Sequence, residues 1–158
     1  MSSDPHSAPA TDQPASRDEV DYGVLNRRFG YLLRRAEQTA TREANVALAP
    51  FDLVTTTYSV LAIIESNPGI SQIAVANALA VERARLVRLI DPLEERGLLQ
   101  RRAGADRRAN ALHLTAKGRS ILAGAHAVLD TEDDKVLARL DVADVAALVA
   151  RFSVFRGG

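Results

Sequence analysis

Two helical patterns joined at the dipeptide Ala80-Val81 constrain the fold of this chain more than any other feature. The first pattern covers about 72–79, follows the turn signal Asn67-Pro68-Gly69, and has Ser71 in the position of a helix cap. The second ends at Gly97, a residue suited to a left-handed cap. Two helices joined by so tight a connection are typical of a helix-turn-helix.

The second of these helices has an apolar stripe and a basic face. The residues expected to point inward are Leu86, Val87, Ile90 and Leu93. With those residues inward, the helical period places the side chains of the N-terminal half, including Arg85 and Arg88, toward solvent. Pro92 has no N–H for the carbonyl of Arg88, which predicts a bend or a lost hydrogen bond in the C-terminal half.

A helix face with closely spaced arginines fits the major groove of B-DNA, where a guanidinium group donates two hydrogen bonds to guanine O6 and N7. We expect Arg85 and Arg88 to contact base edges and Arg83 to contact a phosphate. Ala84 is small enough to allow close approach, for example to a thymine methyl group. The alternative is an ordinary solvated helix face with Arg and Glu at pairing distance. The candidate DNA contacts of the two helices are Ser71, Gln72, Arg83, Ala84, Arg85 and Arg88.

Two segments on either side of a polar stretch predict a β-hairpin at 98–102 and 110–114, the second of which alternates apolar and polar residues. The tip sequence GADRR places Arg107 and Arg108 on a short loop, where they suit a narrow minor groove. Asp106 is expected to orient one of these arginines and so support the wing. The alternative is a surface turn with a weak ion pair. The consecutive order of capped helix, arginine-bearing helix and arginine-tipped hairpin favours the DNA-binding interpretation.

The rest of the chain completes an all-α architecture with a small hairpin. Residues 1–19 are rich in Ser, Pro, Ala and Asp without periodicity, which predicts a disordered tail. Residues 20–158 are expected to form a single domain, with a DNA-binding lobe at about 52–114. The predicted order is four helices, a hairpin and two helices. The flanking helices are expected at about 20–48, from Asp52 to Asn67, at 116–138 after the cap Thr115, and at 142–155.

Charge is distributed unevenly along this chain. Its 20 basic and 20 acidic residues cancel, so net charge alone gives no reason to expect nucleic acid as a partner. However, the segment from Glu82 to Arg119 contains ten basic residues and only five acidic ones, whereas the segment 130–144 and the first 21 residues are acidic. Such a separation indicates a local anion-binding surface. A codon bias toward Arg explains the choice of Arg over Lys but not the clustering.

Several classes of function have no support in the sequence. The chain has no Cys, so we expect no disulfide, thiolate metal site or Cys nucleophile. Its three His residues are scattered and stand beside no catalytic or nucleotide-binding motif, so we expect neither an enzyme, nor a metal, nor a cofactor. No apolar run approaches the roughly 18 residues of a membrane span, and the N-terminus has no apolar export region. We therefore expect a soluble, cytoplasmic protein with no membrane partner.

At the level of motifs, the chain resembles the winged helix-turn-helix of the MarR family of transcriptional regulators. The resemblance lies in PGISQIAVANALAVERARLVRLIDPLEERGLLQRRAGADRRANALHLTAKGRSIL, and most specifically in LEERGLL, in DRR and in LTAKG. Weaker patterning extends from Tyr22 to Phe152. The family fold implies an obligate homodimer, in which the first, fifth and sixth helices of both chains intertwine. It also implies two wings that straddle a pseudo-palindromic operator.

The resemblance also assigns roles to individual residues. By that match, Arg107 and Arg108 enter the minor groove, Asp106 supports them, and residues 84–88 contact the major groove. One departure is that Ala84 and Arg85 stand where small hydroxyl residues are common in the family, so the resemblance implies an altered base preference.

Dimerisation has a second, independent argument. Leu25–Ala44 and Val142–Phe155 are amphipathic segments remote in sequence from the helix-turn-helix, which alone cannot cover both. We therefore expect a homodimer. The alternative is that the two segments pack on each other within one chain.

A small-molecule effector is a further hypothesis. Members of the resembled family often bind small aromatic acids or related anions between the dimer helices and the DNA-binding lobe. We expect Arg27, Tyr31 and Arg34 on one flank of the first helix, which suits an aromatic carboxylate or an acyl-CoA phosphate. The alternative is that aromatic residues are core and that arginines pair with Glu37 or Glu43. The candidate ligand residues are Tyr22, Arg27, Phe29, Tyr31, Arg34, Asp52 and Tyr58.

The sequence thus predicts a sequence-specific regulator that binds double-stranded DNA and acts as a ligand-responsive repressor, released by an aromatic or acyl-CoA-like anion. The alternative from another class is a dimeric winged-helix interaction module that does not bind DNA.

Overall fold

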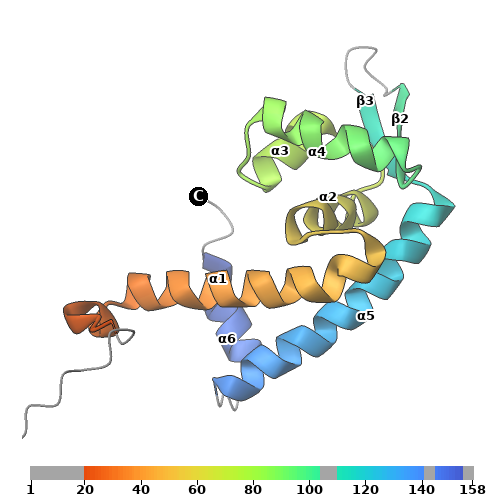
Figure 1. Ribbon diagram of the computed structural model, residues 1–158. Helices are drawn as coiled ribbons and strands as arrows, with labels where there is room; N and C mark the ends of the chain where they lie inside the picture. The colour runs from red at the N-terminus through yellow and green to blue at the C-terminus, as the bar shows by residue number, and fades with distance from the viewer. Residues whose placement is uncertain (1–19, 104–109, 141–144, 155–158) are drawn as a thin grey trace, which may run out of the picture. The chain divides into compact units, whose positions relative to one another are not determined.

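The computed structural model describes residues 20–103, 110–140 and 145–154 (Figure 1). These residues form two compact parts, one ending at Ala36 and one beginning at Glu37. The expected tail at 1–19 and the wing tip with Asp106, Arg107 and Arg108 lie outside the described residues. The single domain expected over 20–158 stays a prediction.

The described residues contain six α-helices and one antiparallel sheet, and the predicted order of four helices, a hairpin and two helices is confirmed. The helices and short 3-10 turns are η1 (Gly23–Arg27), α1 (Phe29–Leu48), η2 (Ala49–Phe51), α2 (Thr55–Ser66), α3 (Gln72–Ala78), α4 (Arg83–Glu95), α5 (Ala116–Arg139) and α6 (Val145–Phe152). The strands are β1 (Ile70–Ser71), β2 (Leu99–Ala103) and β3 (Asn110–Leu114).

The sheet has the strand order β1-β3-β2, with both pairs antiparallel. The β2–β3 register runs from Leu99 opposite Leu114 to Ala103 opposite Asn110, which confirms the hairpin. Strand β1 was not predicted, because two residues are too short to show a period. It is held by Ile70 opposite Leu112, and the hairpin is thereby attached to the start of α3.

An apolar core holds the helix-turn-helix and the sheet together. The buried side chains include Leu61 and Ile64 of α2, Val75 of α3, Leu86, Ile90 and Leu93 of α4, Leu98, Leu112 of β3 and Leu122 of α5. The prediction for Val87 is wrong, because its side chain is 38% exposed. One residue step turns the helix by about a quarter circle, which takes Val87 out of the buried stripe of Leu86 and Ile90.

Caps end or begin these helices at the residues that the sequence predicts. The hydroxyl of Ser71 accepts a hydrogen bond from the N–H of Ala74 at 3.2 Å, and that of Thr115 accepts one from the N–H of Gly118 at 3.0 Å. Gly97 has φ 69°, the left-handed conformation expected of a helix-ending glycine. Helix α4 runs without a break through Pro92, which has no N–H to donate to the carbonyl of Arg88.

The predicted starts of two helices are wrong. The first α-helix begins at Phe29 instead of about residue 20, because Gly23–Arg27 form a 3-10 turn and Arg28 is extended. The second begins at Thr55 instead of Asp52. Asp52 has φ 53°, in the left-handed region, and the hydroxyl of Thr57 accepts a hydrogen bond from the N–H of Val54 at 3.0 Å.

Helix α6 and much of α1 expose their apolar side chains. Val149 of α6 is 50% exposed, and α6 has no buried residue. In α1 only Leu48 is buried, while Val46 is 72% exposed and Phe29 is 69% exposed. Positions 142–144 and 155 of the predicted sixth helix lie outside the described residues. Among the described helices, no single one is long and apolar enough to cross a membrane. One bent pair, Phe29–Phe51 with Thr55–Ser66, meets the length and composition of a span, which is weak evidence.

Candidate nucleic-acid interface

The solvent side of α4 carries three arginines in its first two turns. Leu86, Ile90 and Leu93 are buried on the opposite side and fix the rotation of the helix about its axis. As a result, Arg83, Ala84, Arg85 and Arg88 are all exposed. Within the described residues, none of the three guanidinium groups is held by a carboxylate. The exposed face of α4 therefore presents positive charge that no described residue neutralises.

The connection between α3 and α4 positions this face. Ala80 has φ 50°, a left-handed conformation that non-glycine residues seldom adopt, and the N–H of Val81 donates to the carbonyl of Ala76 at 3.0 Å. The tight turn predicted at Ala80-Val81 is thus present. Two candidate DNA contacts lie at the start of α3. The hydroxyl of Ser71 accepts the capping hydrogen bond from Ala74, and Gln72 is half-buried.

Arg101 ties the base of the hairpin to α4. Its guanidinium group contacts the carboxylates of Asp91 and Glu94, and its backbone N–H donates to Oε1 of Glu94 at 2.9 Å. Burial lowers the pKa of Arg101, but hydrogen bonds to Asp91 and Glu94 outweigh this effect and raise its pKa above the ordinary value. Because these two acidic residues are engaged by Arg101, they do not offset the arginines near the start of α4. Sequence reasoning missed this role, since Arg101 counted only as one basic residue among ten.

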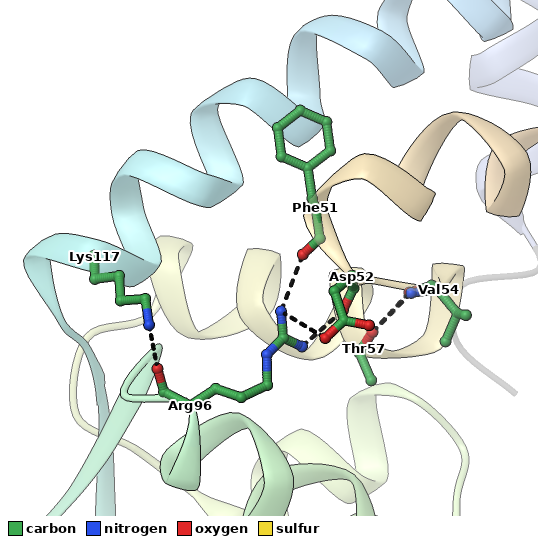
Figure 2. Close-up of polar contacts among 6 residues, drawn as sticks. All are labelled: Phe51, Asp52, Val54, Thr57, Arg96 and Lys117. Carbon is green, nitrogen blue, oxygen red and sulfur yellow. Dashed lines mark hydrogen bonds and ion pairs between the residues drawn. The ribbon is translucent and has the colours of Figure 1, made fainter.

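Arg96 fastens the end of α4 to two other segments (Figure 2). Its guanidinium group donates to the carbonyl of Asp52 at 2.7 Å and to that of Phe51 at 3.0 Å. The ammonium group of Lys117, in the first turn of α5, donates to the carbonyl of Arg96 at 2.8 Å. This three-way junction links α4 to the α1–α2 connection and to the start of α5. No sequence pattern indicates this junction, because two of its acceptors belong to the backbone of residues distant in sequence.

The candidate ligand residues from Glu37 onward take part in polar contacts of their own. Asp52 forms an ion pair with Arg96 at 3.5 Å, although its side chain is 90% exposed. The hydroxyl of Tyr58 lies 2.8 Å from Nδ1 of His126, whose Nε2 lies 3.1 Å from Glu65. Burial raises the pKa of Tyr58, and the negative charges of Asp130, Asp133 and Glu65 raise it further.

The candidate ligand residues before Glu37 form a separate group. The rings of Tyr22 and Tyr31 lie 6.1 Å apart, and the guanidinium of Arg35 lies 5.9 Å from the centre of the Tyr22 ring. The expectation that Arg27 shares a helix flank with Tyr31 and Arg34 is wrong. Arg27 belongs to η1, and the extended Arg28 interrupts the helical spacing before α1 begins. Phe29 is exposed.

The two glutamates weighed as partners for the first-helix arginines have other contacts. Glu43 forms an ion pair with Arg139 at 2.9 Å, and Glu37 accepts a hydrogen bond from Thr41 at 3.1 Å. Among the described residues, no group of three His, Asp or Glu side chains is arranged to hold a metal ion.

Comparisons with known proteins address the same regions. A model of the MarR family matches residues 51–109. A candidate transcriptional regulatory protein for the hcr operon of Thauera aromatica is 34% identical over 141 residues, covering 87% of this chain and 85% of that protein. The structure of the transcriptional repressor CouR bound to a 23-mer DNA duplex matches with a TM-score of 0.80 at 33% identity, covering 87% of this chain and 98% of that one. CouR bound to p-coumaroyl-CoA matches with a TM-score of 0.77 at 31% identity, over 87% and 97% of the two chains.

The matches extend well beyond the helix-turn-helix. The family model covers α2, α3, α4 and β2, whereas the Thauera protein and CouR match most of the chain at more than 30% identity. From its sequence and its fold, this chain belongs to the MarR family of winged helix-turn-helix transcriptional regulators.

Proposed function

We propose that this protein is a repressor that binds double-stranded DNA as a homodimer, and not an enzyme. The observation that carries the proposal is the face of α4, where Arg83, Arg85 and Arg88 are exposed without a carboxylate partner in the described chain. Such a helix, following the capped α3, has the docking geometry of a major-groove helix. The likeness to CouR, whose structure contains a DNA duplex, supports the same conclusion.

The hairpin is proposed to make the second contact with the duplex. Arg107 and Arg108 enter the minor groove, with Asp106 holding one guanidinium in place. Support comes from the described base of the hairpin, where Arg101 joins β2 to Asp91 and Glu94 of α4. Because β2 is attached to α4 in this way, the base of the hairpin and the major-groove helix are held together.

The dimer is proposed to form through the exposed apolar faces of α1 and α6. Side chains such as Val46 and Val149 have 72% and 50% of their surface exposed, and a second copy of the chain removes such apolar surface from water. A two-fold dimer presents two α4 helices to a pseudo-palindromic operator. Adjacent half-sites on one face of B-DNA lie about 34–36 Å apart, so the spacing of the two helices decides whether both bind.

An anionic effector is proposed to control that spacing. The support is CouR, which has been solved with p-coumaroyl-CoA. The effector is an aromatic or acyl-CoA-like anion, and a ligand that binds only the mis-spaced dimer weakens DNA binding by its differential affinity. Its proposed contacts in the part of the chain that ends at Ala36 are Tyr22, Arg27, Phe29, Tyr31 and Arg34, and Asp52 and Tyr58 are separate candidates in the part that begins at Glu37.

The salt dependence of DNA binding tests the proposed function. Operator duplexes are selected from a random pool, and dissociation constants are measured by fluorescence anisotropy at several salt concentrations. Counterion release predicts that log K falls steeply and linearly with log salt, and that replacing Arg107 and Arg108 by Ala flattens this slope. Lys135→Ala, which removes a cation from the exposed pair with Glu132, is the matched control and leaves the slope unchanged. A chain that is dimeric but binds no duplex at low salt is an interaction module instead.

Base preference separates the two kinds of arginine contact. Arg85→Ala is expected to cost about 1–3 kcal/mol at one base position and to relax the preference there. Arg83→Ala is expected to weaken all duplexes equally, because a phosphate contact carries no sequence information. Equal losses on all sequences for Arg85→Ala would show that Arg85 contacts a phosphate.

The effector proposal has its own experiment. The operator complex is titrated with p-coumaroyl-CoA, and with CoA alone as the control. Release of DNA by the acyl-CoA but not by CoA is the expected result. No release at millimolar concentration, in a protein that binds its operator, contradicts an acyl-CoA effector and leaves DNA binding intact.

A further inference from the structure

Beside Arg83 of α4 lies a hollow whose exposed apolar residues, Ile73 and Val87, have no role in the contacts proposed above. It has a volume of about 210 Å³ and is lined by Gln72, Ile73, Arg83, Leu86 and Val87. Leu86 is buried, but Ile73 is 45% exposed and Val87 is 38% exposed. The hollow therefore opens to solvent between the start of α3 and the first two turns of α4.

Its surroundings limit what can occupy it. Arg83 lines the hollow, and Arg85 and Arg88 are exposed on the same helix. An apolar protein surface seated here would desolvate Arg83 without supplying opposite charge, which is costly. A DNA duplex supplies phosphates for the arginines and, in its major groove, one small apolar group, the C5-methyl group of thymine.

The chemistry of the lining favours the methyl group over other features of a base pair. The hydrogen-bonding edge of a base would lose its water against Ile73 and Val87 without gaining a partner. A methyl group loses only unfavourable contact with water. We propose that Ile73 and Val87 form a binding site for the thymine methyl group and so determine one base position in each operator half-site. This inference rests on the proposed function, because it requires α4 to enter the major groove.

Deoxyuridine scanning tests the site, since deoxyuridine differs from thymidine only by the missing methyl group. Each thymine of a selected operator is replaced in turn, and the dissociation constant is measured by fluorescence anisotropy. At one position per half-site we expect binding to weaken about fourfold, and about fifteenfold when both half-sites are changed, as the transfer of one methyl-sized group predicts. The same position with 5-methylcytosine is expected to bind more tightly than with cytosine.

Variants of the protein assign the effect to the hollow. In Val87→Ala and Ile73→Ala, the penalty for deoxyuridine at that position is expected to fall below about twofold, because less of the methyl group is covered. Both residues are partly exposed and neither belongs to the buried core, so truncation is expected to leave the fold intact, which circular dichroism checks. Val54→Ala is the matched control: Val54 is 45% exposed and precedes α2, so the full penalty remains.

The outcomes distinguish this inference from the proposed function. If the protein binds its operator but no deoxyuridine substitution weakens binding, the methyl site is wrong and the function stands. The inference also fails if both variants keep the full penalty, or if Ala84→Gly removes it while Val87→Ala does not, since Ala84 then contacts the methyl group. If no duplex binds at low salt, the proposed function itself fails.

Discussion

Helices α4 and α6 both have apolar stripes with helical spacing, but they bury these stripes to different extents. In α4, Leu86, Ile90 and Leu93 are buried in the core shared with α2, α3 and the sheet. In α6, no residue is buried, and Val149 is 50% exposed. The difference shows that an amphipathic pattern specifies a face to be covered but not what covers it. For α4 the cover is the chain itself, and for α6 we propose a second copy.

The largest difference between the two helices is expected in the core. Leu86→Ala removes a fully buried side chain and is expected to reduce the free energy of unfolding by about 2–5 kcal/mol. The measurement is urea denaturation followed by circular dichroism. Val87→Ala, one position along and partly exposed, is the matched control and is expected to cost less than about 1 kcal/mol. Equal effects of the two substitutions would contradict the orientation of α4.

A charge on α6 is expected to act on association instead. Val149→Glu places a carboxylate on the exposed apolar face, so it is expected to weaken dimerisation at least a hundredfold, because a two-fold interface receives the change twice. Analytical ultracentrifugation measures this effect. Val54→Glu, a change of the same kind at an exposed valine before α2, is the control. A Val149→Glu protein that remains fully dimeric at micromolar concentration would show that α6 does not contribute to the interface.

Close packing at the start of α5 offers a third comparison. A Cβ atom on Gly118 would lie 1.9 Å from the carbonyl oxygen of Leu98, so Gly118→Ala is expected to destabilise the fold by about 1–3 kcal/mol or more. Gly124→Ala meets the ring of Phe51 at 2.5 Å and is expected to cost less, because a side chain shifts more easily than a backbone. Gly30→Ala meets nothing within 4 Å. Thermal unfolding ranks the three, and a Gly118→Ala protein as stable as Gly30→Ala would contradict the packing.

The attachment of the hairpin to α4 is expected to have a moderate effect. Arg101→Ala leaves the carboxylates of Asp91 and Glu94 without their partner and is expected to cost about 1–3 kcal/mol of stability. It is also expected to weaken operator binding, since two negative charges of α4 itself are no longer neutralised. Arg101→Lys is expected to recover part of both losses. Lys135→Ala breaks an exposed pair on α5 and is expected to cost only about 0.2–0.5 kcal/mol.

The smallest effect is expected at the acidic end of α5. Burial raises the pKa of Asp133, and the charges of Asp130 and Asp134 raise it further. Because the folded-state pKa lies above the unfolded value, this carboxyl favours folding at low pH, and that contribution is lost as the pH rises through the folded-state pKa. Asp133→Asn is therefore expected to raise the free energy of unfolding more at pH 7, where Asp133 is charged, than at pH 3. An identical change in stability at both pH values would contradict the shift.

The sequence predicted the parts of the fold that depend on local periods and caps. Ser71, Thr115 and Gly97 mark helix ends whose hydrogen bonds or dihedral angles are local, and the alternation of apolar and polar residues indicated the hairpin. The start of α1 was missed because Gly23 and the carboxylate of Asp21, which accepts from the Gly23 N–H at 2.8 Å, favour a separate turn.

The candidate interface was predictable only where it lies on one helix. Arg83, Arg85 and Arg88 follow from the period of α4, and their exposure agrees with it. Arg96 and Arg101 could not be assigned, because their partners lie on other elements, up to 45 residues away in sequence. The position of Val87 was missed because a four-residue stripe is broad enough to include a residue at its edge. This error hid the hollow that Val87 forms with Ile73.

The junction of Figure 2 depends on the side chain of Arg96 but, for two of its hydrogen bonds, only on the backbone of its partners. At positions 51 and 52, two of the acceptors are main-chain carbonyls, which do not depend on a particular side chain. Substitutions there can reshape the neighbouring surface and still leave those two bonds available. A change at Arg96 removes both at once, and no replacement within the connection can restore them. Variants can thus differ in the side chains of this connection, whereas the two hydrogen bonds require an arginine at position 96.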